Sequence, residues 1–323
     1  MGKPLFLGVD GGGTKTELAL LDCEGNLVAS QSGPSCDYLQ IGLDGVRDVL
    51  AAGLSALFAH AGIAAGAIAH AFFGLPAHGE DAAAQRVLDA LPQSLLGHRR
   101  YRCGNDMVCA WAGSLAGEDG INIVAGTGSI GYGERRGRSA RAGGWGEIFG
   151  DEGSAYWIAA RALNIFSRMS DGRLRRGPLH AALHEALGLE RDLDLCAKVM
   201  HERSRAGIAA LSQLVTRAAQ DGDRAALSIL DDAARELAAI AEALRQALAY
   251  EANERVPVSY SGGVFNCGAL VLEPFERYLK QHCATYKLKR PVFAPSIGAA
   301  IHAAKLAAQP LSVAAIARLR SLS

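Results

Sequence analysis

Twice along this chain, a glycine-rich loop follows a short apolar run and leads into a second run with strand character. The first loop, Asp10–Thr16, follows Leu5–Val9, and the second, Gly126–Gly131, follows the β-branched segment Ile121–Ala125. Loops this short join neighbouring antiparallel strands, whereas a dinucleotide-binding fold alternates strands with helices from its start. We therefore expect two α/β halves that each open with a strand hairpin and are related by a weak internal duplication.

The remaining segments also favour an α/β protein with more than one domain. The chain has 323 residues, which is more than one compact hydrophobic core usually organises. Strand and helix patterns alternate up to residue 112, amphipathic helical patterns dominate 151–250, and a strand pattern returns at Val256–Ser261. The arginine-rich segment 135–141 indicates a solvated hairpin tip. No Pro/Ser-rich linker separates the halves, so we expect a ligand cleft between packed halves.

The three successive glycines of the first loop favour a phosphate-binding backbone. Gly11, Gly12 and Gly13 let the main chain approach a ligand closely and direct several N–H groups toward it. Thr14 and Lys15 add a hydroxyl group and a cation at the same place. The Walker A motif is excluded, because it requires Gly-Lys-Ser/Thr before a helix and a strand pattern follows here. A tight glycine turn without a ligand is the alternative for this loop taken alone.

The second loop matches G-x-G-x-x-G letter for letter. As a dinucleotide-binding motif it is weak, because residues 132–135 have a strand pattern where that motif requires a helix. We interpret it as a second phosphate clamp, which together with the first would hold a nucleoside triphosphate from both sides. A third glycine turn, Ser261–Val264, lies between a strand pattern and a helical stretch, and a plain helix-entry turn is its alternative interpretation.

Asn105 and Asp106 lie just past the predicted strand at Arg99–Cys103 and open a short predicted helix. An aspartate at such a position is most often an N-cap, whose oxygen accepts a hydrogen bond from the first helical turn. The functional alternative is a carboxylate at the carboxyl end of a strand, directed at a ligand. Both interpretations stay open at this point.

Residues 143–154 combine glycine, acids and a tryptophan at unusual density. The indole face of Trp145 and the neighbouring polar groups suit a sugar ring, which offers an apolar face for stacking and hydroxyls for hydrogen bonds. A loop that ends in an Asp–Ser helix entry, at Asp151 and Ser154, is the alternative interpretation.

Composition and charge exclude several classes of partner. Lys+Arg and Asp+Glu both count 33, so the formal net charge is zero and neither nucleic-acid nor membrane binding is expected. Seven cysteines without a CxxC pair predict reduced thiols and a cytoplasmic location, and no targeting or membrane-spanning pattern is seen. His180 and His184 share a helix face without a third ligand, so we expect a solvated face rather than a zinc site.

These segments follow one another in the order found in the sugar kinase/chaperone ATPase/actin superfamily, which the chain resembles over essentially its whole length. Within that superfamily it is similar to the N-acetylglucosamine kinases, which are grouped with the benzoyl-CoA reductase activator ATPases. The run Gly143–Trp157 is the most specific part of this resemblance.

The resemblance implies an α/β fold of the two-domain actin-like ATPase (ribonuclease H-like) type, with a ligand cleft between two duplicated α/β domains. The implied N-terminal domain covers residues 1–117 and is completed by the C-terminal helix at about 296–323. The implied C-terminal domain covers residues 118–295 and contains a large helical insertion.

The resemblance also implies an activity, the ATP- and Mg²⁺-dependent phosphorylation of the C6 hydroxyl of an amino sugar. Asp106 matches the position of the general base, and Asp10 matches the acid that holds Mg²⁺ through water. The positions that match sugar contacts are Asn105, Asp106, Gly144, Trp145, Asp151, Cys36 and Asp37. The positions that match ATP contacts are Gly11, Gly12, Gly13, Thr14, Lys15, Gly126, Thr127, Gly128, Ala209, Gly262 and Gly263.

N-acetylglucosamine is the expected sugar, and glucosamine is the alternative. The family often has Asn where Ile130 stands, and Asn is usual in the early sugar loop, which reads Ser-Cys-Asp-Tyr at 35–38. A glucosamine ammonium would need an acidic partner, for which Asp37 is the candidate. An ATPase that activates a radical dehydratase or reductase would need paired cysteines for an iron–sulfur cluster, and the cysteines here lack that spacing. A homodimer is compatible with the sequence.

Overall fold

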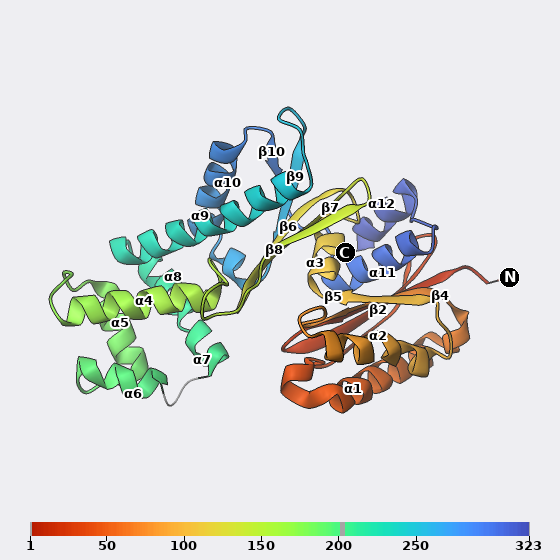
Figure 1. Ribbon diagram of the computed structural model, residues 1–323, viewed down its shortest axis with the longest axis horizontal. Helices are drawn as coiled ribbons and strands as arrows, with labels where there is room; N and C mark the ends of the chain where they lie inside the picture. The colour runs from red at the N-terminus through yellow and green to blue at the C-terminus, as the bar shows by residue number, and fades with distance from the viewer. Residues whose placement is uncertain (1, 201–203, 323) are drawn as a thin grey trace. The chain divides into compact units, whose positions relative to one another are not determined.

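The computed structural model describes residues 2–200 and 204–322 and divides the chain into two compact units (Figure 1). The first unit comprises Met1–Asp119 and Arg290–Ser323, and the second comprises Gly120–Lys289. Each unit is built on its own five-stranded sheet with helices packed against it.

The sheet of the first unit has the order β3-β2-β1-β4-β5. β1, β2 and β3 pair in antiparallel register, whereas β4 and β5 run parallel to β1. In this register Asp10 of β1 lies beside Gly74 of β4, and Gly74 lies beside Gly104 of β5. The carboxyl ends of the three parallel strands therefore meet at one edge of the sheet. The strands are β1 (Leu5–Gly11), β2 (Lys15–Asp22), β3 (Leu27–Pro34), β4 (Ile68–Leu75) and β5 (Tyr101–Asn105).

Helices cover both faces of this sheet. α1 and α2 bury apolar side chains against the face that carries Leu7 and Val9. Successive side chains of a strand alternate between faces, so Gly8 lies on the opposite face, where α11 crosses. A Cβ at Gly8 would lie 2.3 Å from backbone atoms of Ser296 and Ala300, so glycine is what allows α11 to approach β1 this closely. The helices are α1 (Tyr38–Ala61), η1 (Ala65–Ala67), α2 (Ala82–Leu96), α3 (Met107–Ser114), α11 (Pro295–Leu306) and α12 (Val313–Leu322).

The sheet of the second unit repeats the topology of the first. Its order is β10-β9-β6-β7-β8, with β6, β7 and β8 antiparallel and with β9 and β10 parallel to β6. In both sheets, the first three strands in chain order form an antiparallel meander. The next two strands then run parallel to the first strand and lie on its other side. The duplication expected from the two glycine loops is therefore present in the strand order. The strands are β6 (Gly120–Ala125), β7 (Ser129–Arg135), β8 (Arg138–Gly143), β9 (Val256–Ser261) and β10 (Tyr286–Leu288).

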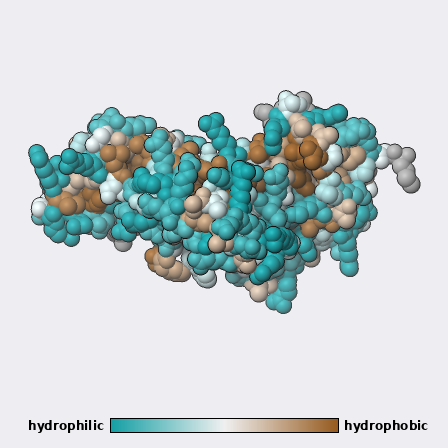
Figure 2. All heavy atoms as spheres, turned by 90° about the horizontal axis from the view of Figure 1, so that it is seen from above, coloured by the Kyte–Doolittle hydropathy of each residue, from teal (hydrophilic) through white to brown (hydrophobic). Residues whose placement is uncertain are grey.

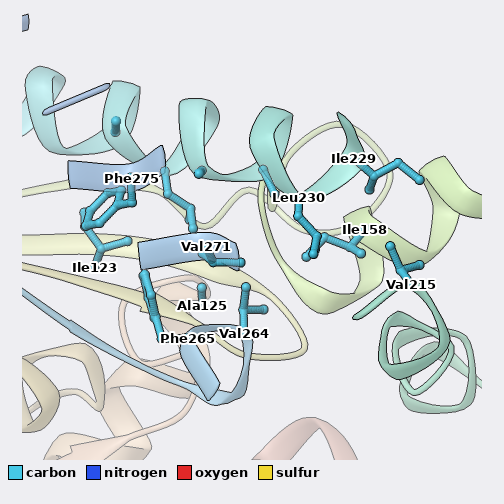
Figure 3. Close-up of a cluster of buried hydrophobic side chains, with 14 of the residues drawn as sticks. Ile123, Ala125, Ile158, Val215, Ile229, Leu230, Val264, Phe265, Val271 and Phe275 are labelled. Carbon is cyan, nitrogen blue, oxygen red and sulfur yellow. The ribbon is translucent and has the colours of Figure 1, made fainter. Parts of the chain in front are cut away.

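One apolar core joins the second sheet to the helices inserted between β8 and β9. Figure 3 shows Leu230 of α9 near Ile158 of α4 and Val215 of α8, while Ile123 of β6 packs toward Phe275 of α10. Burying a side chain of this size contributes about 1.5–3 kcal/mol relative to exposure. The helices between β8 and β9 are α4 (Ala155–Ser170), α5 (Pro178–Leu187), η2 (Asp192–Asp194), α6 (Leu195–Met200), α7 (Arg205–Ala209), α8 (Ser212–Gln220) and α9 (Arg224–Ala247), and η3 (Gly263–Cys267) and α10 (Ala269–His282) follow β9.

The arginine-rich segment forms the hairpin tip that its composition predicts, although one of its arginines, Arg135, is buried rather than solvated. Residues 138–143 form β8, an edge strand, and the turn is only Arg136 and Gly137, both with positive φ. Arg135 is buried, and its Nε donates to the Glu254 carboxylate at 2.8 Å. The hairpin tip is therefore confirmed at the exposed turn, whereas the extent of strand β8 was not predicted, because the charged outward side chains of an edge strand resemble those of a loop.

The surface agrees with the balanced composition. The face in Figure 2 is mainly hydrophilic, with apolar areas between the polar side chains. Within residues 2–200 and 204–322, every helix is too short or too polar to span a membrane.

Candidate functional site

In the first unit, the glycine loop between β1 and β2 is a tight turn held by its neighbours. The N–H of Gly12 donates to the carbonyl of Lys15 at 2.9 Å. The carbonyl oxygens of Gly12 and Gly13 accept from Ser35 Oγ at 2.9 Å and from Gln40 Nε2 at 3.0 Å. Gly13, Thr14 and Lys15 are exposed, and Lys15 Nζ pairs with Glu17 at 2.6 Å. The loop therefore presents its glycine backbone, a hydroxyl and a lysine at the surface of the unit.

Two carboxylates lie close together at the parallel strand ends of this unit. Asp10 precedes the glycine loop, and Asp106 follows β5 directly. Burial raises the pKa of Asp10 well above its ordinary value, and the charges of Asp106 and Glu17 add to this effect. Burial also raises the pKa of the Asp106 carboxyl group to about 6, although the backbone N–H groups of Met107 and Asp106 itself oppose the rise. Such perturbed acids at strand ends are typical of functional sites.

The capping interpretation of Asp106 is not supported. Asp106 has helical backbone angles, and its side chain makes no capping hydrogen bond within the described chain. The preceding residue takes this role instead, because Asn105 Oδ1 accepts from the N–H of Met107 at 3.1 Å. The Asp106 carboxylate is therefore available for a task other than starting α3.

The early loop residues are engaged in local structure. Asp37 is the N-cap of α1, accepting from the N–H of Leu39 at 3.0 Å and from Gln40 Nε2 at 2.9 Å. Cys36 is buried, and its Sγ lies 2.4 Å from where a Cβ on Gly11 would stand. Cys36 therefore packs against Gly11 of the glycine loop, and the Asp37 carboxylate already accepts two hydrogen bonds.

In the second unit, the glycine loop between β6 and β7 is docked on a helix. The N–H of Gly126 donates to the carbonyl of Gly128 at 2.9 Å. The carbonyl oxygens of Gly126 and Thr127 accept from the N–H groups of Ala155 and Tyr156, which begin α4. Orphan donors at the start of α4 are thus satisfied by the loop, and the loop is fixed by the helix.

A pocket of about 710 Å³ opens beside this loop, entirely within the second unit. Its wall gathers Gly126 and Thr127 from the loop, Ala209 from α7 and Gly263 from η3. These are four of the residues that the sequence predicts as ATP contacts. The remaining wall mixes apolar side chains of α4 and η3 with amide, hydroxyl and guanidinium groups of α8, and the volume is within the range of small-molecule sites. Gly262 precedes this wall with a positive φ of 96°.

The segment Gly144–Asp151, here called the tryptophan loop, has an exposed apolar part and a buried acidic end. Trp145 is 70% exposed, and Ile148 and Phe149 are also exposed. Asp151 is buried and has a positive φ of 55°, which is rare for a residue other than glycine and signals backbone strain. Gly144 lies against Ile130, whose Cδ1 would be 2.7 Å from a Cβ at that glycine. Ile130 therefore packs under the tryptophan loop.

Arg205 is a charged neighbour of this loop that sequence reasoning missed. Its Nη2 lies 2.5 Å from Asp151 Oδ2, and its Nε lies 3.1 Å from Glu147 Oε2. Burial raises the pKa of Asp151, whereas the Arg205 charge opposes that rise. The sequence carries no signal for this pair, because Arg205 stands in a stretch rich in arginine, far from Asp151 along the chain.

The histidines of α5 are not the solvated pair that their spacing predicts. His180 is buried and stacks on Phe166 with ring centroids 4.4 Å apart. Its Nε2 lies 3.2 Å from Asp192, which also faces His184 at 3.6 Å. Among the residues that the structure describes, no group of three or more histidines, cysteines or acids is arranged to hold a metal ion.

Comparison with known proteins yields two relatives of stated activity. The N-acetyl-D-glucosamine kinase of Dictyostelium discoideum is 27% identical over 316 residues, which are 93% of this chain and 98% of that protein. The N-acetylmuramic acid/N-acetylglucosamine kinase of Clostridium acetobutylicum is 34% identical over 186 residues, which are 57% of this chain and 60% of that protein.

Two solved structures share the fold of this chain. A candidate N-acetylglucosamine kinase from Chromobacterium violaceum has a TM-score of 0.74 and 27% identity, covering 93% of this chain and 99% of that one. A ROK family glucokinase from Streptomyces griseus, at 19% identity and a TM-score of 0.57, covers 92% of this chain and 98% of that one and shares the fold. The predicted fold class is confirmed.

The family itself is established by a match that spans almost the whole chain. The profile of the BadF/BadG/BcrA/BcrD ATPase family matches residues 7–303, which include both glycine loops, the acids of the first unit and the pocket of the second. The resemblance inferred from the motifs is confirmed, and this protein belongs to the BadF/BadG/BcrA/BcrD ATPase family.

Proposed function

We propose that this protein is an ATP-dependent sugar kinase that phosphorylates the C6 hydroxyl of N-acetylglucosamine. The observation that carries the proposal is the likeness to an N-acetyl-D-glucosamine kinase across 93% of this chain and 98% of that protein.

The pocket of the second unit is the proposed adenosine site. Its small residues, such as Ala209 and Gly263, leave space for a flat base, and the polar groups of α8 supply hydrogen-bonding partners. Gly126 and Thr127 at its edge would place backbone groups beside the phosphates. In the first unit, the exposed residues Gly13, Thr14 and Lys15 would supply a backbone donor, a hydroxyl group and a cation.

Asp106 is the proposed general base. A base must accept the proton of the attacking sugar hydroxyl, and it works best when its pKa is near the working pH. Burial raises the pKa of Asp106 to about 6, which meets this requirement while leaving the carboxylate ionised at neutral pH.

The residues around Asp10 fit a magnesium ion. Desolvation raises the pKa of the half-buried Asp10, the charge of Asp106 adds to that rise, and a divalent cation would offset the repulsion between the two acids. Asp10 would hold the ion through water, and when bound the ion neutralises charge on the phosphates.

The tryptophan loop is the proposed sugar site, with Trp145 stacking on the ring and the Asp151 carboxylate accepting hydrogen bonds from hydroxyls. The state of Asp37 supports N-acetylglucosamine over glucosamine. Its carboxylate accepts from Leu39 and from Gln40, so it is already engaged as a helix cap and not poised for a buried ammonium.

A coupled assay of ADP release against a panel of hexosamines tests the proposal. We expect N-acetylglucosamine to have the highest kcat/KM, and mass spectrometry and NMR of the product to place the phosphate on C6. A kcat/KM for glucosamine at least tenfold above that for N-acetylglucosamine would overturn the choice of sugar. Turnover of ATP without transfer to any sugar would overturn the kinase.

A further inference from the structure

Arg205 joins the two acids of the tryptophan loop. Its Nη2 contacts the buried Asp151 carboxylate at 2.5 Å, and its Nε contacts the partly exposed Glu147 at 3.1 Å. A planar guanidinium can satisfy two acceptors with different nitrogens at once, which a lysine ammonium on a flexible stem does with less geometric control. The arginine is itself about half exposed, so it reaches the buried acid from the outer side.

The helix that carries Arg205 also forms a wall of the proposed nucleotide pocket. α7 is one short segment, Arg205–Ala209, whose start is capped by Ser204 through a 3.1 Å bond from the N–H of Gly207. Ala206 and Ala209 line the pocket beside Gly126 and Thr127. A single turn of helix therefore contacts the pocket with its alanines and the tryptophan loop with its arginine.

The ion pair also touches the glycine loop of the second unit. A Cβ placed on Gly128 would lie 2.7 Å from Asp151 Oδ2 and 2.9 Å from Arg205 Nη2. The proposed phosphate-binding backbone and the buried acid are thus in direct contact beside the guanidinium. Three elements from distant parts of the chain, the loop, the acid and α7, meet at this point.

The contact between Arg205 and Asp151 affects the pKa of the Asp151 carboxyl group. Burial raises the pKa of Asp151, and the charge and hydrogen bond of Arg205 oppose that rise. Glu147, from the tryptophan loop itself, is the other charged group in contact with Arg205 that the structure records. Removing the guanidinium would raise the pKa of Asp151 further, so its ionised form would be lost at a higher pH than in wild type.

We propose that Arg205 is a positioning residue that couples the two substrates. It orients the Asp151 carboxylate for the sugar, and nucleotide binding, by filling the pocket against α7, fixes Arg205 in that position. This inference rests on the proposed function. It predicts that sugar and nucleotide bind more tightly together than either binds alone, and that Arg205 carries much of this synergy.

Calorimetric titration tests the coupling. N-acetylglucosamine is titrated into wild type, Arg205→Gln and Arg205→Lys, with and without a non-hydrolysable ATP analogue and Mg²⁺, between about pH 6 and pH 8. In wild type we expect the analogue to tighten sugar binding about fivefold or more. In Arg205→Gln we expect sugar binding to weaken about tenfold, to lose the synergy, and to depend more steeply on pH than in wild type, weakening as the pH is lowered. Arg205→Lys should keep the flatter pH profile but lose the synergy.

Arg173→Gln is the matched control. It removes another half-exposed arginine of the same unit that pairs with an aspartate, Asp171, at 2.7 Å and lies in no proposed site. Its binding constants should equal those of wild type.

Wild type without synergy, or Arg205→Gln with wild-type synergy and pH profile, would overturn the coupling. If Arg205→Gln does not fold, the same titrations are made with Arg205→Lys and Glu147→Gln. If the analogue tightens sugar binding in both variants as much as in wild type, the inference is overturned. Failure of the proposed function is separate, because it is seen in wild type as absence of phosphoryl transfer to N-acetylglucosamine.

Discussion

The two units share one strand order but differ in the residues at the carboxyl ends of their parallel strands. In the first unit, β1 ends with Asp10 and Gly11, and Asp106 comes directly after β5. In the second unit, Gly126 comes directly after β6 and Gly262 directly after β9. The same sheet edge thus carries acids in one unit and bare backbone in the other.

The difference extends to the elements around each edge. The glycine loop of the second unit is docked on the start of α4, and helices inserted between β8 and β9 wall a pocket next to it. The glycine loop of the first unit is held by the side chains of Ser35 and Gln40. A duplicated fold therefore supports two tasks, because function depends on the residues placed at the strand ends rather than on the sheet. We expect the first unit to supply the chemistry and the second to supply most of the nucleotide affinity.

The largest expected effect tests the chemical role of the first unit. Asp106→Asn keeps the shape of the side chain but cannot accept a proton, so kcat should fall at least ~10²-fold while both substrates bind normally. Helix α3 should be unaffected, because Asn105 provides its capping bond. Steady-state kinetics with calorimetry checks this, and Asp48→Asn, an exposed acid of α1, is the control. Near-normal turnover in a folded Asp106→Asn protein would show that the base lies elsewhere.

A second experiment compares the two glycine loops directly. A valine at Gly128 would meet Asp151 at 2.7 Å and Arg205 at 2.9 Å, whereas a valine at Gly12 would meet the Lys15 carbonyl at 3.1 Å. Gly128→Val should therefore weaken both nucleotide and sugar binding about tenfold or more, and Gly12→Val should weaken nucleotide binding by less. Calorimetry with each ligand separates these outcomes. Equal losses in the two variants, or unchanged affinities, would mean that the units do not divide the work in this way.

The pH dependence of kcat should show an effect smaller than those of the Asp106 and glycine-loop variants. Burial raises the pKa of Asp106 to about 6, and only the ionised carboxylate can act as a base. Activity should therefore be present above pH 6 and should fall about tenfold per pH unit below it. Rate measurements at saturating substrates between about pH 5 and pH 8 check this, with the coupling enzymes tested separately. A flat profile through this range would contradict the role of the carboxylate.

The smallest effect concerns the early loop. Asp37→Asn preserves a good N-cap for α1, so stability and kcat/KM for N-acetylglucosamine should stay within about threefold of wild type. The same substitution should also leave the weaker activity on glucosamine unchanged. A selective tenfold loss on glucosamine would instead identify Asp37 as the partner of its ammonium.

Local patterns predicted the elements whose signals are themselves local. The apolar runs at Leu5–Val9 and Ile121–Ala125 became central strands, and the glycine loops after them became turns between antiparallel strands. Strand β8 was missed because its outward positions are polar at the edge of the sheet. α12 was not separated from α11, because both are rich in alanine, although Pro310 between them is a local signal for a helix boundary.

The sequence by itself determined the family, the duplicated architecture and the functional groups that the candidate site residues can offer, because strand alternation, glycine turns and motif order depend on neighbouring residues. Tertiary structure decided how those residues are used. It removed much of the Asp106 carboxyl group from water and so raised its pKa to about 6, engaged Asp37 as a helix cap, and set Arg205 against Asp151. Burial and ion pairing depend on segments far apart in the chain, and an electrostatic interaction is strong only where folding has removed water. No local pattern around Arg205 could therefore have revealed its partner.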